Sequence, residues 1–195
     1  NGADAKVTID GKIKLGSVTL SSGTLTVNST DGYIGGLSIN GGKADIDGAD
    51  VDTIAINGGD TVIKNVNAGS LSVNAGTTDG SGYNVSIVSG RFNNVNCETD
   101  SGYTVGKAIA SGSRVIGSNA NGAIVYKYAD IQNMTEADAI TVIKCDHKDK
   151  NGSYKLDGNP CHYCNEEIVA TVSYTADGSE QTDLFSDIYD AFERA

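Results

Sequence analysis

The chain is poor in several residue types, and each shortage argues against a class of structure or partner. It has one proline, no tryptophan, and only 14 lysine and arginine residues against 25 aspartate and glutamate residues, so its formal charge is −11. This negative field repels phosphate groups, and we therefore expect no nucleic-acid partner. No apolar run approaches the roughly 18 residues of a membrane-spanning helix, so we expect no membrane insertion.

The first ten residues, NGADAKVTID, contain neither the basic nor the apolar region of a signal peptide. We therefore expect the chain to be a monomeric module of a longer protein. Glycine is plentiful, with 25 residues in a chain of 195. This composition favours a turn-rich β structure over a helical bundle.

One six-residue sequence motif recurs every 17 residues, as LSINGG at 37–42, IAINGG at 54–59 and LSVNAG at 71–76. Apolar residues alternate with polar ones and are interrupted by glycine corners, which is typical of short half-buried strands. A unit this short cannot bury its own apolar face, so successive units must stack strand over strand. We predict an all-β fold with a parallel β-solenoid over residues 1–132. The recurring asparagines should form a ladder of side-chain amides; they are Asn40, Asn57 and Asn74.

The same pattern recurs at other spacings. Val18–Val27 matches Leu37–Ile46 at an offset of 19, and Val85–Gly90 matches 71–76 at an offset of 14. These spacings do not fit the six-residue repeat of a left-handed β-helix, so the right-handed β-helix is favoured. Residues 114–131 are predicted to be longer strands forming the last coils.

A second sequence motif occurs in three expected loops, as STDGY ending at Tyr33, TTDGSGY ending at Tyr83 and ETDSGY ending at Tyr103. Their tyrosines are separated by near-multiples of the coil length, so the loops should emerge on one side. Tyrosine beside serine, glycine and aspartate on a rigid scaffold is typical of recognition surfaces. Alternatively, these are ordinary turns and the tyrosines cover the strand below. The predicted binding residues are Tyr33, Tyr83, Tyr103, Asp31, Asp79 and Asp100.

Two groups of acidic residues admit other interpretations. Asp79 and Asp100 lie in equivalent loops about one coil apart, where two carboxylates about 5 Å apart would suit a retaining glycosidase. The lack of tryptophan and of a basic cluster counts against a polysaccharide substrate, so we predict a non-catalytic protein. Four aspartates alternate with apolar residues at 45–52, and a solvated strand face is favoured over a calcium site because the nine-residue calcium repeat is absent.

Three of the four cysteines and both histidines lie within 20 residues, in CDHKDKNGSYKLDGNPCHYC. Cys145, His147, Cys161 and Cys164 supply four nitrogen and sulfur donors with no open position, which predicts a structural zinc ion in a knuckle-like junction over 133–168. In an oxidising setting, Cys161 and Cys164 would instead form a disulfide, leaving Cys145 to pair with Cys97 or stand free. His162 should point to solvent, and Cys97 should be buried.

Residues 169–195 are predicted to form a strand and an amphipathic helix that cap the end of the solenoid. Thr182 would begin the helix. One helical face would carry the apolar residues Leu184, Phe185, Ile188, Ala191 and Phe192.

The segment ITVIKCDHKDKNGSYKLDGNPCHYCNEEIVATVSYTADGSEQTDLFSDIYDAFERA, residues 140–195, resembles the junction of large modular cell-surface proteins of gut Firmicutes. In that family, a Cys-x-His…Cys-x-x-Cys knuckle follows a Gly-rich parallel β-helix. The resemblance implies a secreted or wall-attached bacterial protein whose partner is a host protein, such as a mucosal glycoprotein or an immunoglobulin, or a glycan. We predict a non-catalytic adhesin or binding module. The alternatives are a polysaccharide-degrading β-helix enzyme using Asp79 and Asp100, and a purely structural spacer.

Overall fold

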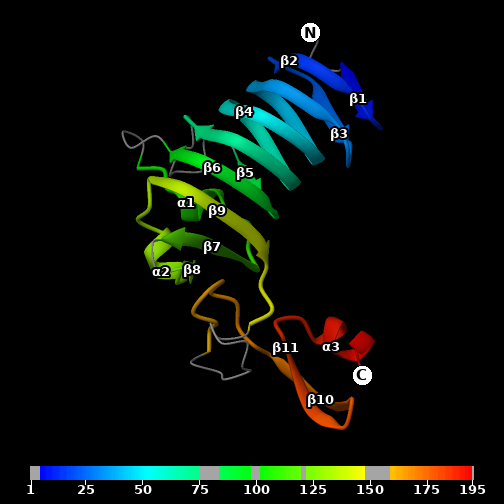
Figure 1. The fold of residues 1–195 in the computed structure, drawn as a ribbon, viewed down its shortest axis with the longest axis vertical. Helices are drawn as coiled ribbons and strands as arrows, with labels where there is room; N and C mark the ends of the chain where they lie inside the picture. Colours follow the sequence, from blue (N-terminus) through cyan, green and yellow to red (C-terminus); the bar gives the residue numbers. More distant parts are fainter. Residues whose placement is uncertain (1–4, 75–83, 98–101, 120–121, 148–158, 195) are drawn as a thin grey trace.

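The computed structural model describes residues 5–74, 84–97, 102–119, 122–147 and 159–194. Of these described residues, 63% are in strands and 9% in helices, so the predicted all-β class is confirmed. β1 and β2 lie at one end of the long axis, and the β10–β11 hairpin lies at the other (Figure 1). Among the described residues, none of the helices has the length and hydrophobicity that a membrane crossing requires.

The elements follow one another in a simple order along the chain. They are β1 (Lys6–Asp10), β2 (Lys14–Leu20), β3 (Thr24–Asn28), β4 (Tyr33–Val73), β5 (Val85–Ile87), β6 (Gly90–Cys97), α1 (Val105–Ala108), β7 (Ser113–Asn119), β8 (Gly122–Val125), α2 (Tyr128–Ile131), β9 (Glu136–Lys144), β10 (Ala170–Ala176), β11 (Ser179–Phe185) and α3 (Ile188–Arg194).

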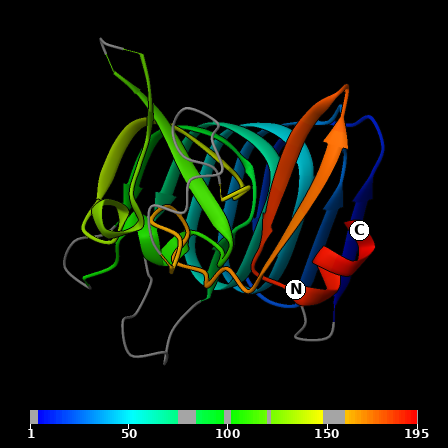
Figure 2. The same cartoon turned by 90° about the horizontal axis from the view of Figure 1, so that it is seen from below.

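The first part of the chain is joined by parallel strand pairs. β1 pairs with β3, β2 and β3 pair with β4, and β4 pairs with β5 and β6, all in parallel. Val18 lies beside Leu37 and Val27 beside Ile46, so the predicted offset of 19 is confirmed. β4 folds back on itself in several passes (Figure 1), which stack behind one another when seen from below (Figure 2).

The 17-residue repeat is visible within β4 as contacts between equivalent side chains. Asn57 Nδ2 donates to Asn40 Oδ1 at 2.8 Å, and Asn74 Nδ2 donates to Asn57 Oδ1 at 2.7 Å. The predicted amide ladder is therefore confirmed. The apolar repeat residues fill the core, each 2% exposed or less; among them are Leu37, Ile39, Ile54, Ile56, Leu71 and Val73.

The predicted offset of 14 is wrong. Val85 lies beside Thr61 and Val95 beside Leu71, so both pairs are 24 residues apart. Any strand that alternates valine with serine resembles any other, so a short phrase match cannot choose between neighbouring strands. Only the hydrogen-bonded register identifies the partner.

The sheet becomes antiparallel after β6. β9 lies between β6 and β7 and is antiparallel to both, and β7 pairs with β8 as an antiparallel hairpin. Residues 114–131 are therefore not further parallel coils. The expected boundary at 132/133 falls inside this sheet, because β9 supplies the buried residues Ile140 and Val142. Sequence spacing does not show that a later strand returns to an earlier one.

The C-terminal segment forms a separate two-stranded antiparallel sheet, β10–β11, on which α3 packs. Thr182 lies in β11 and pairs with Ser173, so it does not begin the helix. Asp187 does so instead, accepting a hydrogen bond from the Tyr189 backbone N–H at 2.7 Å. The predicted apolar helix face is also wrong, because Leu184 and Phe185 belong to β11 and only Ala191 of α3 is buried.

Candidate metal centre

Cys145 and His147 are delivered by the end of β9. The backbone N–H of Cys145 donates to the carbonyl oxygen of Gly112 at 2.8 Å, which extends the β7–β9 pairing by one bond. His147 has a φ of +57°, a left-handed conformation that is uncommon for residues other than glycine. Its backbone N–H donates to the Sγ of Cys145 at 3.4 Å. The sheet therefore fixes one half of the site.

A tight turn over residues 161–165, the cysteine turn, supplies Cys161 and Cys164. The N–H of Asn165 donates to the carbonyl of Cys161 at 2.8 Å, and the N–H of Cys161 donates to the carbonyl of Glu166 at 2.8 Å. The turn is held to the start of α2 by a hydrogen bond of 2.8 Å from the Tyr128 N–H to the carbonyl of His162. The His162 side chain is exposed, as predicted.

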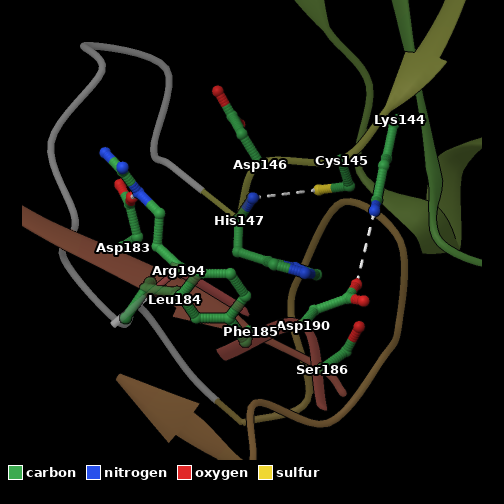
Figure 3. A pocket seen from close by; sticks show the side chains of 10 residues that line it. All are labelled: Lys144, Cys145, Asp146, His147, Asp183, Leu184, Phe185, Ser186, Asp190 and Arg194. Atoms are coloured by element: carbon green, nitrogen blue, oxygen red, sulfur yellow. Dashed lines mark hydrogen bonds and ion pairs between the residues drawn. The ribbon is translucent and has the colours of Figure 1, made fainter. Parts of the chain in front are cut away.

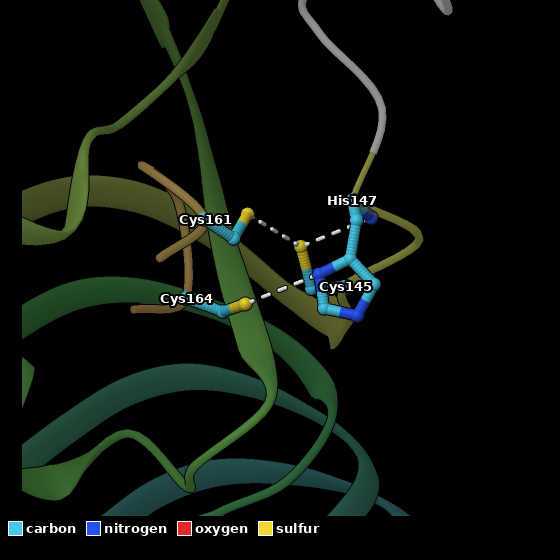
Figure 4. Close-up of side chains that lie close together, drawn as sticks. All are labelled: Cys145, His147, Cys161 and Cys164. Atoms are coloured by element: carbon cyan, nitrogen blue, oxygen red, sulfur yellow. Dashed lines mark hydrogen bonds between the residues drawn. The ribbon is translucent and has the colours of Figure 1, made fainter. Parts of the chain in front are cut away.

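The four predicted ligands converge (Figure 4). Their donor atoms all lie within 4.8 Å of one another, with Cys145 Sγ 3.9 Å from Cys161 Sγ and Cys164 Sγ 3.5 Å from His147 Nδ1. Tetrahedral zinc, with bonds of about 2.3 Å to sulfur and 2.0–2.1 Å to nitrogen, places two sulfurs about 3.8 Å apart and sulfur and nitrogen about 3.6 Å apart. The cluster therefore has the dimensions of a four-coordinate metal site.

The surroundings of the cluster resemble a small closed core rather than an exposed patch. The three cysteines are 4–6% exposed and His147 is 9% exposed. The cysteines, packed with the half-buried Tyr163 and Ile168, form a hydrophobic cluster of their own. All four cysteines of the chain are free, including the buried Cys97.

Contacts within the cluster decide which groups carry charge. Hydrogen bonds with Cys145 and Cys164 hold the pKa of Cys161 far below its ordinary value, and the contact with Cys161 raises the pKa of Cys145 well above it. Hydrogen bonds to Cys161 and Cys164 raise the pKa of His147 to about 9. The site therefore stabilises a thiolate, which is the form of cysteine that binds metals.

A cleft of about 320 Å³ lies between the cluster and the C-terminal unit, which consists of β10, β11 and α3 (Figure 3). Cys145 and His147 line one side, and Ser186, Asp190 and Arg194 are among the residues that line the other. Asp190 forms an ion pair of 3.5 Å with Lys144, which ties α3 to the end of β9. Four protein ligands would leave a metal no open position toward this cavity, which argues against metal-based catalysis there.

One residue of this joint was not predicted from the sequence. Glu166 accepts a hydrogen bond of 3.0 Å from Ser111 and one of 2.7 Å from Ser186. It therefore bridges the sheet and the C-terminal unit beside the cysteine turn. Ser111 precedes Glu166 by 55 residues, and no spacing pattern could have associated them.

The predicted tyrosine surface is only partly visible. Tyr103 is 4% exposed and belongs to the main core, so it presents no surface to a partner. Tyr33 is half-buried and donates a hydrogen bond to Asp52, which raises the pKa of the Tyr33 phenol. Asp31 is exposed and pairs with Lys12 at 2.9 Å. Three predicted residues lie outside the described ranges, namely Tyr83, Asp79 and Asp100.

The aspartates at 45–52 do not converge. Asp47 accepts a hydrogen bond from Asn65 at 2.8 Å, and Asp50 accepts one from Asn67 at 3.0 Å. Asp45 pairs with Lys64 at 3.6 Å. Each carboxylate therefore contacts the neighbouring pass of the sheet. Among the described residues, the cysteine and histidine cluster is the one group found with metal-binding geometry.

Comparison of the chain with models of protein families, with curated proteins and with solved structures gave no match. The interpretation of the centre therefore rests on its own geometry and chemistry.

Proposed function

We propose that Cys145, His147, Cys161 and Cys164 bind one structural zinc ion. Three thiolates and an imidazole form a donor set typical of structural zinc. The general order of divalent-metal affinities, the Irving–Williams order, does not by itself select zinc over other metals. Support comes from the spacing of the donor atoms, from their burial and from the thiolate that the cluster stabilises. The ion would fasten the cysteine turn to the end of β9.

We further propose that the repeating part of the chain is a parallel β-solenoid. The supporting observations are the parallel registers, the amide ladder and the columns of buried aliphatic residues. The right-handed form remains a prediction. Such a stack is stiff, because each pass is held by hydrogen bonds and packing from both neighbours.

The function that the geometry supports best is that of a non-catalytic scaffold in a bacterial surface protein, presenting a binding face to a host protein or glycan. The observation that carries this proposal is the closed, buried four-donor cluster at the joint between the sheet and the C-terminal unit. A metal in such a cluster holds two parts together instead of reacting. The resemblance to Firmicutes surface proteins supports the proposed location.

With Tyr103 buried, we place the binding face on the strands. A groove of about 730 Å³ crosses the first passes of the sheet and is lined by Lys43, Asp60 and Gly42, among others. Lys43 and Asp60 are exposed and of opposite charge, so the groove offers donors and acceptors to a polar ligand. A host glycan or a polar protein loop suits such a surface better than an apolar ligand does.

The metal proposal is tested by elemental analysis of the purified protein. We expect about one zinc ion per chain in the parent and a clear loss of zinc in Cys164→Ser. Cys97→Ser is the matched control, since Cys97 is also a buried free cysteine but lies outside the cluster, and it should keep the metal. A metal-free parent whose Cys161–Cys164 segment is two protons lighter would establish a disulfide instead.

The binding proposal is tested on a glycan array and on immobilised mucosal glycoproteins and immunoglobulins. We expect the double variant Lys43→Ala with Asp60→Ala to lose binding that the parent shows. Lys127→Ala with Asp130→Ala removes the same types of charge at α2 and should bind like the parent. A parent that binds nothing would favour the spacer, and sugar release from a polysaccharide panel would favour the enzyme.

A further inference from the structure

A second groove on the sheet has no role in the proposed function. It has a volume of about 530 Å³ and crosses the antiparallel pair formed by β6 and β9. In register, Asn96 lies beside Glu136 and Val95 beside Ala137. The residues that line the groove are these four together with Asn94, Tyr126 and Asp138. The middle of the chain therefore builds the whole groove.

Two carboxylates in this groove lack a partner within the chain. Glu136 and Asp138 are exposed, and among the described residues no ion pair or hydrogen bond is found for either carboxylate. The aspartates of β4 differ, because each of them contacts a lysine, an asparagine or a tyrosine; they are Asp45, Asp47, Asp50, Asp52 and Asp60. Glu136 and Asp138 are therefore open to a ligand in a way that the β4 aspartates are not.

The groove also lacks a positive charge of its own. Among the described residues that line it, none is a lysine or an arginine. Lys127 follows Tyr126 in sequence but lines a different groove, beside the cysteine turn. Glu136 and Asp138 are two residues apart on one strand, which places their Cα atoms about 7 Å apart. Two negative charges at this separation repel anions and attract cations.

The remaining polar side chains of the groove are suited to a cation with N–H donors. Asn94 Nδ2 donates to the carbonyl oxygen of Gly69 at 3.3 Å, which leaves its Oδ1 as an acceptor. The ring of Tyr126 packs against Gly117 of β7, where an added Cβ atom would lie 2.5 Å from the ring atom Cε2. Ammonium groups donate to carboxylate and amide oxygens, and an aromatic ring attracts a cation over its face.

We propose that this groove binds a ligand that carries two alkylammonium groups. One ammonium group would contact Glu136 and the other Asp138, and the carbon chain between them would lie along Ala137. A free diamine and a pair of lysine side chains from a partner protein share this chemistry. A calcium ion, which takes six to eight oxygen ligands, suits two carboxylates on one strand less well. The site is separate from the groove at Lys43 and Asp60 and does not depend on the proposed function.

The proposal is tested by nuclear magnetic resonance on the whole chain as purified, with 1,4-diaminobutane as the probe. We expect saturable shifts of the backbone amide signals of residues 94–96 and 136–138. The dissociation constant should rise in about 1 M salt, where the screening length falls to about 3 Å. Butylamine, which has one ammonium group, should bind more weakly than the diamine.

A pair of double variants tests the two carboxylates. Glu136→Gln with Asp138→Asn keeps the shape of both side chains, and we expect the dissociation constant to rise about tenfold or more because charged acceptors are lost. Asp45→Asn with Asp47→Asn is the matched control. It changes the net charge by the same amount at the same spacing, but these aspartates already contact Lys64 and Asn65. The control variant should bind the diamine like the parent.

Two probes separate the possible sources of the ammonium groups. If the ligand is a small molecule, 1,4-diaminobutane should bind more tightly than the peptide Lys-Gly-Lys. If a partner protein supplies the lysines, the peptide should bind more tightly than the diamine. Both results support the proposed chemistry, provided that the variant at 136 and 138 weakens binding of the tighter probe.

Four outcomes would overturn the proposal. The first is a parent, with the expected strand content by circular dichroism, that shows no saturable shift with either probe. The second is equal weakening in both double variants, which would mean that only the net charge matters. The third is unchanged binding in the variant at 136 and 138, which would place the cation elsewhere. The fourth is tighter binding of calcium chloride than of either amine at the same residues, which would indicate an inorganic cation site.

Discussion

Gly59 lies directly against the backbone of Gly42. A Cβ atom added to Gly59 would lie 2.5 Å from the carbonyl oxygen of Gly42, a distance that real Cβ atoms essentially never show, and Gly59 has a φ of +80°. The two glycines occupy equivalent positions one 17-residue repeat apart. The corner of each pass therefore fits closely against the corner of the next, and glycine is required for both conformation and space.

We expect Gly59→Ala to destabilise the sheet by about 3 kcal/mol or more, because the backbone of the neighbouring pass would have to move. Gly11→Ala is the matched control, since Gly11 has a similar φ of +74° but has no atom within 4 Å of an added Cβ. It should cost only the conformational term of about 1–2 kcal/mol. Urea unfolding measures both, and equal losses would show that the close contact adds nothing.

The amide ladder should contribute measurably to stability. Asn57→Ala removes one hydrogen bond to Asn40 and one from Asn74, and we expect a loss of about 1 kcal/mol because the bonds are exposed. Asn96→Ala changes an exposed asparagine of β6 for which no side-chain hydrogen bond is found among the described residues. If the two variants have the same unfolding midpoint, the ladder is not stabilising.

Alkaline pH should destabilise the main sheet. Burial raises the pKa of Tyr103 to about 12 and that of Cys97 to about 12. Both groups are neutral when protonated, so between their ordinary pKa values and about pH 12 the folded chain binds more protons than the unfolded chain. The free energy of unfolding then falls as pH rises, by at most about 1.4 kcal/mol per pH unit for each group.

The variants Tyr103→Phe and Cys97→Ala should each reduce this alkaline slope, because each removes one titrating group. Tyr189→Phe serves as the comparison, since the Tyr189 side chain is 77% exposed instead of being enclosed. Thermal melts between pH 8 and 12 give the slope. An unchanged slope in both core variants would mean that neither group controls the alkaline loss.

Metal removal should act on the joint and leave the parallel sheet in place. We expect a strong chelator, or Cys145→Ser, to increase hydrogen exchange in residues 159–194, because the cysteine turn would lose its fastening to β9. The buried strand β4 should keep its protection, since its neighbours are unchanged. Cys97→Ser should leave the exchange of residues 159–194 unaltered. Global unfolding on chelation would mean that the metal stabilises the whole chain.

Much of the repeating region was predictable from the sequence, because stacked strands place equivalent residues at a regular spacing along the chain. The 17-residue phrase, the offset of 19 and the amide ladder each follow from equivalent residues lying beside one another. The convergence of Cys145, His147, Cys161 and Cys164 was predictable for a related reason, since paired donors at short spacing around a turn are typical of metal knuckles. In both cases, local patterns carry the information.

The sequence did not reveal which surfaces would be covered. Tyr103 and Tyr33 end nearly identical phrases, yet one is buried in the core and the other lies at the surface. Tyr103 belongs to a core cluster that also contains residues of α1, β7 and β9, and a local motif does not encode this packing. The same reason explains the apolar residues of α3, which the helical pattern predicted to be buried and the structure leaves exposed.

By itself, the sequence determined the all-β class, the stacking of equivalent residues and the set of cysteine and histidine side chains that converge, because spacing fixes which residues can lie together in a repeating chain. Tertiary structure alone decided that β9 returns between β6 and β7 and that Glu166 joins two distant serines. These features arise from contacts between segments far apart in the chain, and such contacts produce no repeating pattern in the sequence.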